Sequence, residues 1–575
     1  MATTAAADAT PPPLHDVPNA KQKKYDRQLR LWAASGQQAL EEAHILLINS
    51  GAGVTGIETL KNLILPGVGK YTILDSAVVS EEDLGVNFFL DESTLGGFRA
   101  EHTCRLLQEL NPDVEGHFVT EPVESFIQKE QALQPYTLII VTAPISSDVL
   151  ASISTYSQKN HVPVFYTHCV GFYSRFSLSL PPAFPIVDTH PDPTATTDLR
   201  LLKPWPAIQE FAREKTANLS TLSEHDLGHV PYLLLLLHYV EEWKKSHDGV
   251  PPTSYKDKTD FRDMIKAAAP SPDEENYAEA AAAVLKSLNP PQPSSSLLET
   301  LNASESQSIT SGSPSFWIIA NAVYKFYESH NELPLPGAVP DMKAQSADYI
   351  RLQNIYKTRA RQDAQEVLAT VRALEKQLGR PAGQAIDEKE VEAFCKGAAH
   401  VKLVRGRPLF LPSGDNHTKR YNWSSEATSS AAMALMMASD SGILLSIAFL
   451  AWDLFVATHE SLTPGTALKI PGAKTEDIES DEEKLRGIAQ SLLDDLIKAS
   501  GTFIEDHEYT KLKETLGNIT TELVRAGGSE LHNIASLTGG MVAQEVIKVI
   551  TKQYVPVDNT CVFDGVFSKA AVLRL

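Results

Sequence analysis

Residues 45–75 constrain the fold more than any other stretch of this chain. An apolar run leads into a glycine loop with the spacing G-x-G-x-x-G (Gly51, Gly53, Gly56). The loop is followed by a helical pattern and then by a second apolar run, which ends at Asp75. Glycines at this spacing allow a tight turn that brings a phosphate to the helix N-terminus, and the acid is placed to bind a ribose hydroxyl. The pattern predicts a doubly wound, nucleotide-binding type of fold. It fits equally a turn that kept its glycines for packing and lost its ligand.

Composition narrows the class of partner. The chain has 575 residues, enough for two or more domains, and a formal net charge of −21. This charge argues against nucleic acid or an anionic membrane as the main partner and favours a protein. Four widely spaced cysteines form no Cys-x-x-Cys pair, so neither a zinc site nor disulfides are expected. Residues 1–20 lack the apolar core of a secretory signal and are predicted to be disordered, which favours a cytoplasmic or nuclear protein.

The remaining pattern predicts a discontinuous domain. Short apolar runs at 136–142 and 162–167 are typical of buried parallel strands, and 172–180 alternates like a half-buried strand. Two further short strands at 560–563 and 570–575 cannot form a sheet alone and are expected to join the first one. We therefore predict one α/β domain with a mostly parallel sheet, made of residues 21–180 and 505–575.

Residues 181–504 are predicted to be a helical domain inserted into the α/β domain. Helical patterns there alternate with Pro- and Ser-rich breaks. The most apolar stretch, 442–457, is too short to cross a bilayer comfortably and contains Asp453, so we expect a buried helix. His225, Asp226 and His229 cluster without further spaced ligands, and we interpret them as a polar helix start and not as a metal site.

Five segments together resemble the adenylation domains of ubiquitin-type activating enzymes. These segments are 25–32, the glycine loop with 58–63, 99–101, 544–548 and 563–565. With the insertion, the resemblance covers nearly the whole chain. It implies a Rossmann-like, discontinuous sheet, and a site that in active members takes ATP and magnesium.

The chain departs from the active pattern at the positions that would handle phosphates. Ala77 replaces a second acid, Val86 an arginine, and Arg99 a lysine, while the expected magnesium aspartate is missing, with no carboxylate after 142 until Asp148. Val54 also stands where active members usually carry another glycine. Loss of a phosphate-contacting arginine can cost about 10³-fold in rate by analogy with arginine fingers. The resemblance therefore implies a pseudo-adenylation domain in which Gly51, Gly53, Gly56 and Asp75 are vestigial.

The inserted domain also lacks a catalytic thiol. Its one cysteine, Cys395, is surrounded by acids, which raise the pKa of a thiol, and it lacks the Cys-Thr context of active members. No catalytic residue and no metal site is expected in this chain. ATP and magnesium would bind in the site of a homologous, active chain.

In some enzymes of this family the inactive and the active half are separate chains. The length of the insertion indicates which of these enzymes the chain resembles. An insertion of about 300 residues resembles the non-catalytic subunit serving the Nedd/Rub modifier more than the one serving SUMO. The implied partners are a homologous catalytic subunit, the modifier and the conjugating enzyme. The SUMO-type subunit stays an alternative, as does, more remotely, an NAD-dependent oxidoreductase. The helices around Ile57, Leu60 and Ile64 and from Met541 are candidates for either core or interface.

Arg27 is the one residue to which the resemblance assigns a part in catalysis. In dimers of this family the arginine of the Tyr-x-Arg-Gln segment reaches ATP phosphates in the other protomer's site, and Arg27 matches it. A permanent charge and planar donors suit this contact. The alternative is a surface pair with Asp26 or a neighbouring carboxylate on an exposed helix, worth about 0–1 kcal/mol.

Overall fold

The computed structural model describes residues 19–189, 198–271, 273–289, 293–414, 419–423, 425–436, 442–459 and 468–575. All but the last two residues of the predicted disordered tail lie outside this part, and α1 begins at Ala20. The chain divides into two compact units. Unit 1 comprises residues 1–184 and 405–575, and unit 2 comprises residues 185–404.

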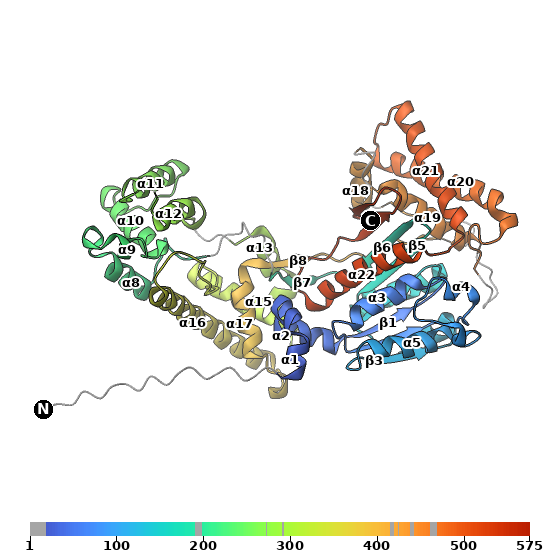
Figure 1. The fold of residues 1–575 in the computed structure, drawn as a ribbon, viewed down its shortest axis with the longest axis horizontal. Coiled ribbons are helices and arrows are strands. Elements are labelled where there is room, and N and C mark those ends of the chain that lie inside the picture. Colours follow the sequence, from blue (N-terminus) through green and yellow to red (C-terminus); the bar gives the residue numbers. More distant parts are fainter. Residues whose placement is uncertain are drawn as a thin grey trace. The chain divides into compact units, whose positions relative to one another are not determined.

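Unit 1 is built on one eight-stranded sheet with the order β10-β9-β6-β5-β4-β1-β2-β3 (Figure 1). Its strands are β1 (His44–Ile48), β2 (Lys70–Leu74), β3 (Glu115–Val119), β4 (Leu138–Thr142), β5 (Val164–Val170), β6 (Tyr173–Ser179), β9 (Thr560–Asp564) and β10 (Lys569–Leu573). The five neighbouring strands β5, β4, β1, β2 and β3 are parallel to one another. At the other side of β5, the strands β6, β9 and β10 continue the sheet in antiparallel pairs. The prediction of a mostly parallel sheet completed by the C-terminal strands is confirmed.

Alternate residues of the buried strands face two helical layers. On one face lie α3 (Val54–Ile64), α5 (Arg99–Leu110) and α22 (His532–Thr551), with α22 packed along α3. On the other face, side chains of β1, β4 and β5 share a core with α6 (Val123–Ile127) and α7 (Ser147–Asn160). Covering on both faces explains why these strands read as continuous apolar runs.

The sequence analysis missed three strands, β3, β7 (Phe184–Val187) and β8 (Val401–Val404). Of these, β3 lies at an edge of the eight-stranded sheet. β3 pairs only with β2, and its five residues are exposed or half-buried. An edge strand of this kind carries no apolar run, so its composition does not distinguish it from a loop.

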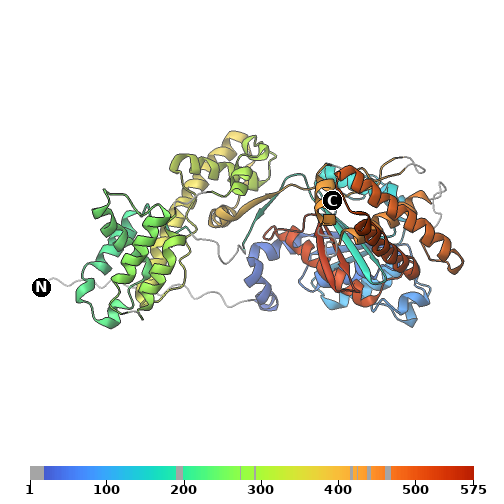
Figure 2. The ribbon, with the colours of Figure 1, turned by 90° about the horizontal axis from the view of Figure 1, so that it is seen from above.

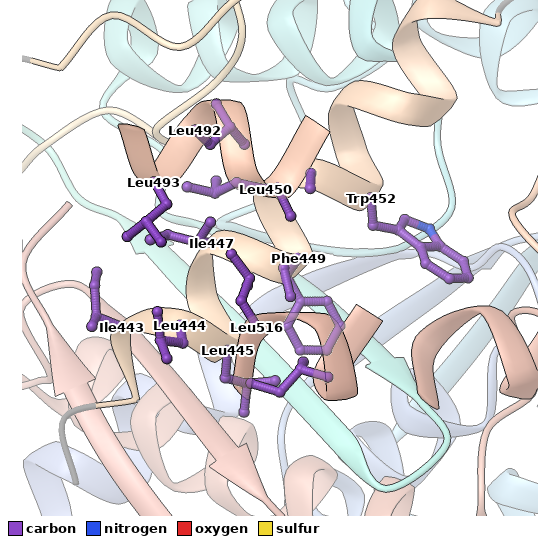
Figure 3. Close-up of a cluster of buried hydrophobic side chains, with 14 of the residues drawn as sticks. Ile443, Leu444, Leu445, Ile447, Phe449, Leu450, Trp452, Leu492, Leu493 and Leu516 are labelled. Atoms are coloured by element: carbon purple, nitrogen blue, oxygen red, sulfur yellow. The ribbon is translucent and has the colours of Figure 1, made fainter. Parts of the chain in front are cut away.

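Unit 1 also contains helices that we had assigned to the insertion. These are α18 (Ser425–Met436), α19 (Ile443–Thr458) and α20 (Ile478–Ser500). They pack with α21 (Asp506–Ala526), which the prediction already placed in the α/β domain. The apolar face of α19 packs on α20 and α21 and shares one core with strand residues such as Val170 and Val562 (Figure 3). The helical unit therefore ends at residue 404 and not at 504. Helical periodicity does not reveal which neighbour a helix will cover.

Unit 2 is helical except for a two-stranded sheet of β7 (Phe184–Val187) and β8 (Val401–Val404), within the residues described (Figure 2). Its helices are α8 (Pro206–Thr216), α9 (Glu224–Leu227), α10 (Tyr232–Ser246), α11 (Tyr255–Ala267), α12 (Glu275–Ser287), α13 (Ser295–Leu301), α14 (Ser304–Gln307), α15 (Ser315–His330), α16 (Ser346–Leu378) and α17 (Glu388–Gly397). The remaining helices of unit 1 are α1 (Ala20–Lys24), α2 (Asp26–Glu42) and α4 (Glu81–Leu84). Across the described part of the chain, no helix is both long and apolar enough to cross a membrane.

A buried ion pair joins α19 to the sheet. Asp453 accepts a hydrogen bond from Arg175 of β6 at 2.6 Å and from the Tyr166 hydroxyl of β5 at 2.9 Å. Burial opposes ionisation of Asp453, but Arg175, His168 and Tyr166 together hold its pKa below the usual value. The otherwise apolar helix therefore carries one charge that specifies its contact with the sheet.

We expect Asp453→Asn to lower the free energy of unfolding by about 3 kcal/mol, because breaking a buried pair leaves Arg175 uncompensated. Urea denaturation near neutral pH measures this, with the exposed α20 residue Asp495 as control: Asp495→Asn should change stability by less than about 0.5 kcal/mol. Because the folded pKa of Asp453 is lowered, its contribution is complete above the unfolded pKa of about 3.9 and is lost as pH falls through the folded pKa. Equal stability of wild type and Asp453→Asn at neutral pH would contradict the assignment.

Candidate functional site

The glycine loop lies where a doubly wound sheet binds its ligands. β1 pairs with β2 on one side and with β4 on the other, so the chain leaves β1 at the point where the strand order reverses. In open sheets of this kind the ligand site is the crevice at the carboxyl ends of those strands. Here that crevice is bounded by the loop after β1 and by residues 143–147 after β4.

The three glycines of the loop are required by contacts within the chain. Gly51 and Gly53 have φ values of +61° and +66°, which disfavour side chains. A Cβ on Gly53 would lie 2.3 Å from Nδ2 of Asn49, and one on Gly56 would lie 2.7 Å from its Oδ1. The spacing is thus explained by packing against Asn49, without a ligand.

The acid that would bind a ribose is already paired. Oδ2 of Asp75 accepts a hydrogen bond from Nε of Arg99 at 2.7 Å and from Nδ2 of Asn49 at 2.9 Å. Arg99 also donates to Oδ1 of Asp83 at 3.0 Å. Burial opposes the charged form of Arg99, but the two carboxylates raise the pKa of the guanidinium above its ordinary value. Asp75 and Arg99 are each only 4% exposed, so the two residues close this end of the crevice.

A carboxylate from the far end of the chain lies at the amino end of α3. Oε2 of Glu530 accepts hydrogen bonds from both the backbone N–H and the hydroxyl of Thr55, each at 2.7 Å. Glu530 is 4% exposed. Burial raises its pKa, while the hydrogen bonds from Thr55 and from the backbone of Gly53 act in the opposite direction. In a nucleotide-binding unit, a phosphate would take the place of this carboxylate.

An apolar cluster includes two residues of the glycine loop, Ala52 and Val54. Val86, which replaces the arginine of active members, packs against this cluster. The other members come from the loop, from α22 and the residue before it, and from β5 and β9: Ala52, Val54, Cys169, Leu531, Ile534, Ala535 and Phe563. Apolar side chains at this place supply no charge to a triphosphate.

No metal ligand faces the loop from β4. Pro144 lies against Gly51, and the first carboxylate after the strand, Asp148, has a side chain that is 78% exposed and lies 3.3 Å from Lys419. No group of three or more potential ligands that could hold a metal occurs among the residues described. The loop region therefore does not fit ATP with magnesium, because the ribose acid and the Thr55 donors at the amino end of α3 already bind other groups of the chain.

Two of these partners could not have been identified from the sequence. Asp83 and Glu530 belong to no motif, and only Arg99 is signalled, as a substitution of the expected lysine. Glu530 lies hundreds of positions from Thr55 along the chain. A buried acid at such a separation leaves no local pattern.

The helix that carries Arg27 is anchored while Arg27 itself is exposed. Tyr25, two residues earlier, is buried, and its hydroxyl accepts a hydrogen bond from Asn111 at 3.0 Å. Asp26 pairs with Arg30 at 2.9 Å, so the alternative pairing of Arg27 with Asp26 is not found. Among the described residues, Arg27 has no ion-pair partner.

The sequence analysis singled out two further groups of residues: the helices around Ile57 and from Met541, as candidates for core or interface, and the cluster around His225. Ile57, Leu60 and Ile64 are buried in the packing of α3, whereas Met541 is half-buried and lines a groove of about 550 Å³ with Leu537 and other residues of α22 and α3. His225 and His229 stack on each other at the short α9, which Ser223 caps. This agrees with the interpretation as a polar helix start.

A family model and the similar proteins found by sequence comparison point to the same family. The model of the ThiF family matches residues 25–573. The NEDD8-activating enzyme E1 regulatory subunit of Xenopus laevis is 36% identical over 97% of this chain and 99% of its own length. That of Danio rerio is 33% identical over 97% and 100%. The NEDD8-activating enzyme E1 regulatory subunit AXR1 of Arabidopsis thaliana is 33% identical over 96% of each chain.

Cys395 should be chemically inert in the folded chain. It is buried on α17, and burial, with Asp363 and Glu392, raises its pKa to about 12. At about pH 8 the thiolate fraction is then on the order of 10⁻⁴. We expect iodoacetamide to leave Cys395 unlabelled in the native protein and to label it in concentrated guanidinium, as peptide mass spectrometry would show. Rapid labelling of native Cys395 would mean that the thiol is exposed and activated.

Proposed function

Because the chain belongs to the ThiF family and, within it, to the regulatory subunits of the NEDD8-activating enzyme E1, we propose that it supports adenylation in its partner without binding ATP itself. It is a subunit of an enzyme whose adenylation site uses ATP and magnesium, and it pairs with a catalytic subunit that acts on NEDD8. The observation that carries the proposal is the pairing of Asp75 with Arg99, because it removes the ribose acid from use.

Three further features support the absence of chemistry in this chain. Glu530 lies where phosphates would bind, Val86 supplies no charge, and Cys395 is buried with a raised pKa. Pyrophosphate release leaves charge that cations and a metal must neutralise, and Arg99, the cation beside the glycine loop, is already paired with Asp75 and Asp83. The vestigial loop, Gly51 to Gly56, would then serve packing alone.

The same pairing weakens the two alternatives. An NAD-dependent oxidoreductase needs a free ribose acid, and Asp75 is buried against Arg99. The similar proteins named above are regulatory subunits for NEDD8, which disfavours the SUMO-type subunit. The conjugating enzyme as a further partner, and a cytoplasmic or nuclear location, stay predictions.

Arg27 is the proposed contribution of this chain to its partner's site. Tyr25 holds the start of α2 in place, and the guanidinium two residues later is exposed and without an internal ion pair among the described residues. An exposed, permanently charged fork on an anchored helix is suited to reach phosphate oxygens on another chain.

We expect the isolated chain to show no ATP–pyrophosphate exchange with NEDD8 and no thioester on a non-reducing gel. The reason is the closed loop and the buried thiol described above. The complex with its catalytic subunit, assayed in parallel, provides the positive control. ATP–pyrophosphate exchange by the isolated chain at a rate comparable with that of the complex would overturn the proposal that only the partner adenylates NEDD8.

We expect Arg27→Ala to slow adenylation by the assembled complex by about 10³-fold at subsaturating ATP, the lower end for an arginine acting across an interface. Arg30→Ala is the matched control, because Arg30 lies on the same exposed helix and pairs only with Asp26. Size-exclusion chromatography should show that both variants assemble. Normal exchange kinetics in the Arg27→Ala complex would reduce Arg27 to a surface residue.

A further inference from the structure

Arg27 lies on a short arm, residues 26–31, which is flanked by two buried aromatic residues. Tyr25 directly precedes the arm and Trp32 directly follows it, and both are buried. Each residue of the arm itself is exposed or half-buried. The helix is interrupted after the arm, where Ala33 has a φ of +55°. The arm is therefore fixed mainly by what holds Tyr25 and Trp32.

Asn111 holds the first of these aromatic residues. Nδ2 of Asn111 donates hydrogen bonds to the hydroxyl of Tyr25 at 3.0 Å and to the carbonyl of Ile64, the last residue of α3, at 2.9 Å. Because Asn111 is only 2% exposed, these hydrogen bonds are stronger than they would be in water. The ring of Tyr25 also lies against Gly67, at which a Cβ would come within 2.8 Å of the hydroxyl oxygen. The amino end of the arm is thus seated on the end of α3.

Gln37 holds the second aromatic residue on the same turn. Its Oε1 accepts a hydrogen bond from Nε1 of Trp32 at 3.2 Å, and its Nε2 donates to the carbonyl of Pro66 at 3.2 Å. Gln553, from the C-terminal part of unit 1, donates to the backbone carbonyl of Trp32 at 2.9 Å. Both ends of the arm are therefore tied to the turn that ends α3, residues 64–67.

We propose that the turn at residues 64–67, together with Asn111, forms a seat that positions Arg27 for the ATP phosphates of the partner's site. The inference rests on the proposed role of Arg27 and adds the residues that act through it. Ordering a flexible segment on binding costs conformational entropy, so an arm that is already fixed brings its guanidinium to a phosphate at a smaller cost. The seat also gives α3 a part in the reaction, although its glycine loop, as proposed, binds no nucleotide. Tyr25, Asn111 and Gln37 are buried within this chain and act through Arg27, so they are positioning residues.

The test is a double-mutant cycle in the assembled complex, followed as ATP–pyrophosphate exchange at subsaturating ATP. Tyr25→Phe removes only the hydroxyl that Asn111 holds. We expect it to slow exchange about 10-fold, because misplacing a catalytic group by about 1 Å can cost up to about 10²-fold. In the Arg27→Ala complex the same substitution should change the rate by less than about twofold, since a residue that acts only through Arg27 then has nothing left to position.

Tyr71→Phe is the matched control. Tyr71 is buried on β2, and its hydroxyl donates to the carbonyl of Cys104 at 3.0 Å, so the substitution removes one buried hydrogen bond that does not involve the arm. We expect thermal unfolding of both variants a few degrees below that of wild type, and slowed exchange for Tyr25→Phe alone.

Two results would rule out the seat: exchange by the Tyr25→Phe complex as fast as that by the Tyr71→Phe complex, or equal slowing by Tyr25→Phe with and without the Arg27 side chain. If Tyr25→Phe does not assemble with the partner, Asn111→Ala is judged by the same criteria. Normal exchange by the Arg27→Ala complex would instead contradict the proposed role of Arg27, and the seat with it. Failure of the seat alone and failure of the proposed function are therefore distinguishable.

Discussion

Buried polar groups that no ligand satisfies need partners inside the protein, and this need shapes the region around the glycine loop. Leaving such a donor or acceptor unpaired costs about 1–3 kcal/mol, and more if it is charged. Asp75 is therefore met by Arg99, and the first turn of α3 by Glu530. The loop keeps the shape of a nucleotide site, yet its hydrogen bonds run within the chain.

The same interactions hold a discontinuous domain together. The N-terminal part contributes the loop and α3, whereas Glu530, α22, β9 and β10 come from the C-terminal part. Glu530 bonds to Thr55, α22 packs along α3, and β9 pairs with β6, so three kinds of contact join the two parts. On the other side of the sheet, the buried pair of Arg175 and Asp453 fixes α19.

Much of the fold followed from patterns that are local in the chain. Apolar runs for β1, β4 and β5 and the helical pattern that became α16 are set by side chains close in sequence. The strand β6 was predicted as well, but as half-buried, whereas all of its residues are buried. The buried position of α19 could be predicted in the same way, from its apolar residues. Val86 and Arg99 were singled out only by the resemblance to adenylation domains, as departures from the active pattern. β3 was missed because an exposed edge strand has no apolar signature.

The amino-acid sequence by itself determined the α/β class and the return of the C-terminal strands to the sheet. Its resemblance to adenylation domains further implies the loss of charges that would handle phosphates. Tertiary structure alone decided that α18 to α20 belong with the sheet, that Arg99 binds Asp75, and that Glu530 binds the first turn of α3. The physical reason is distance along the chain: burial and hydrogen bonding pair groups that are 24 residues apart for Arg99 and Asp75 and 475 apart for Glu530 and Thr55. No periodicity or local propensity records which distant group will be the partner.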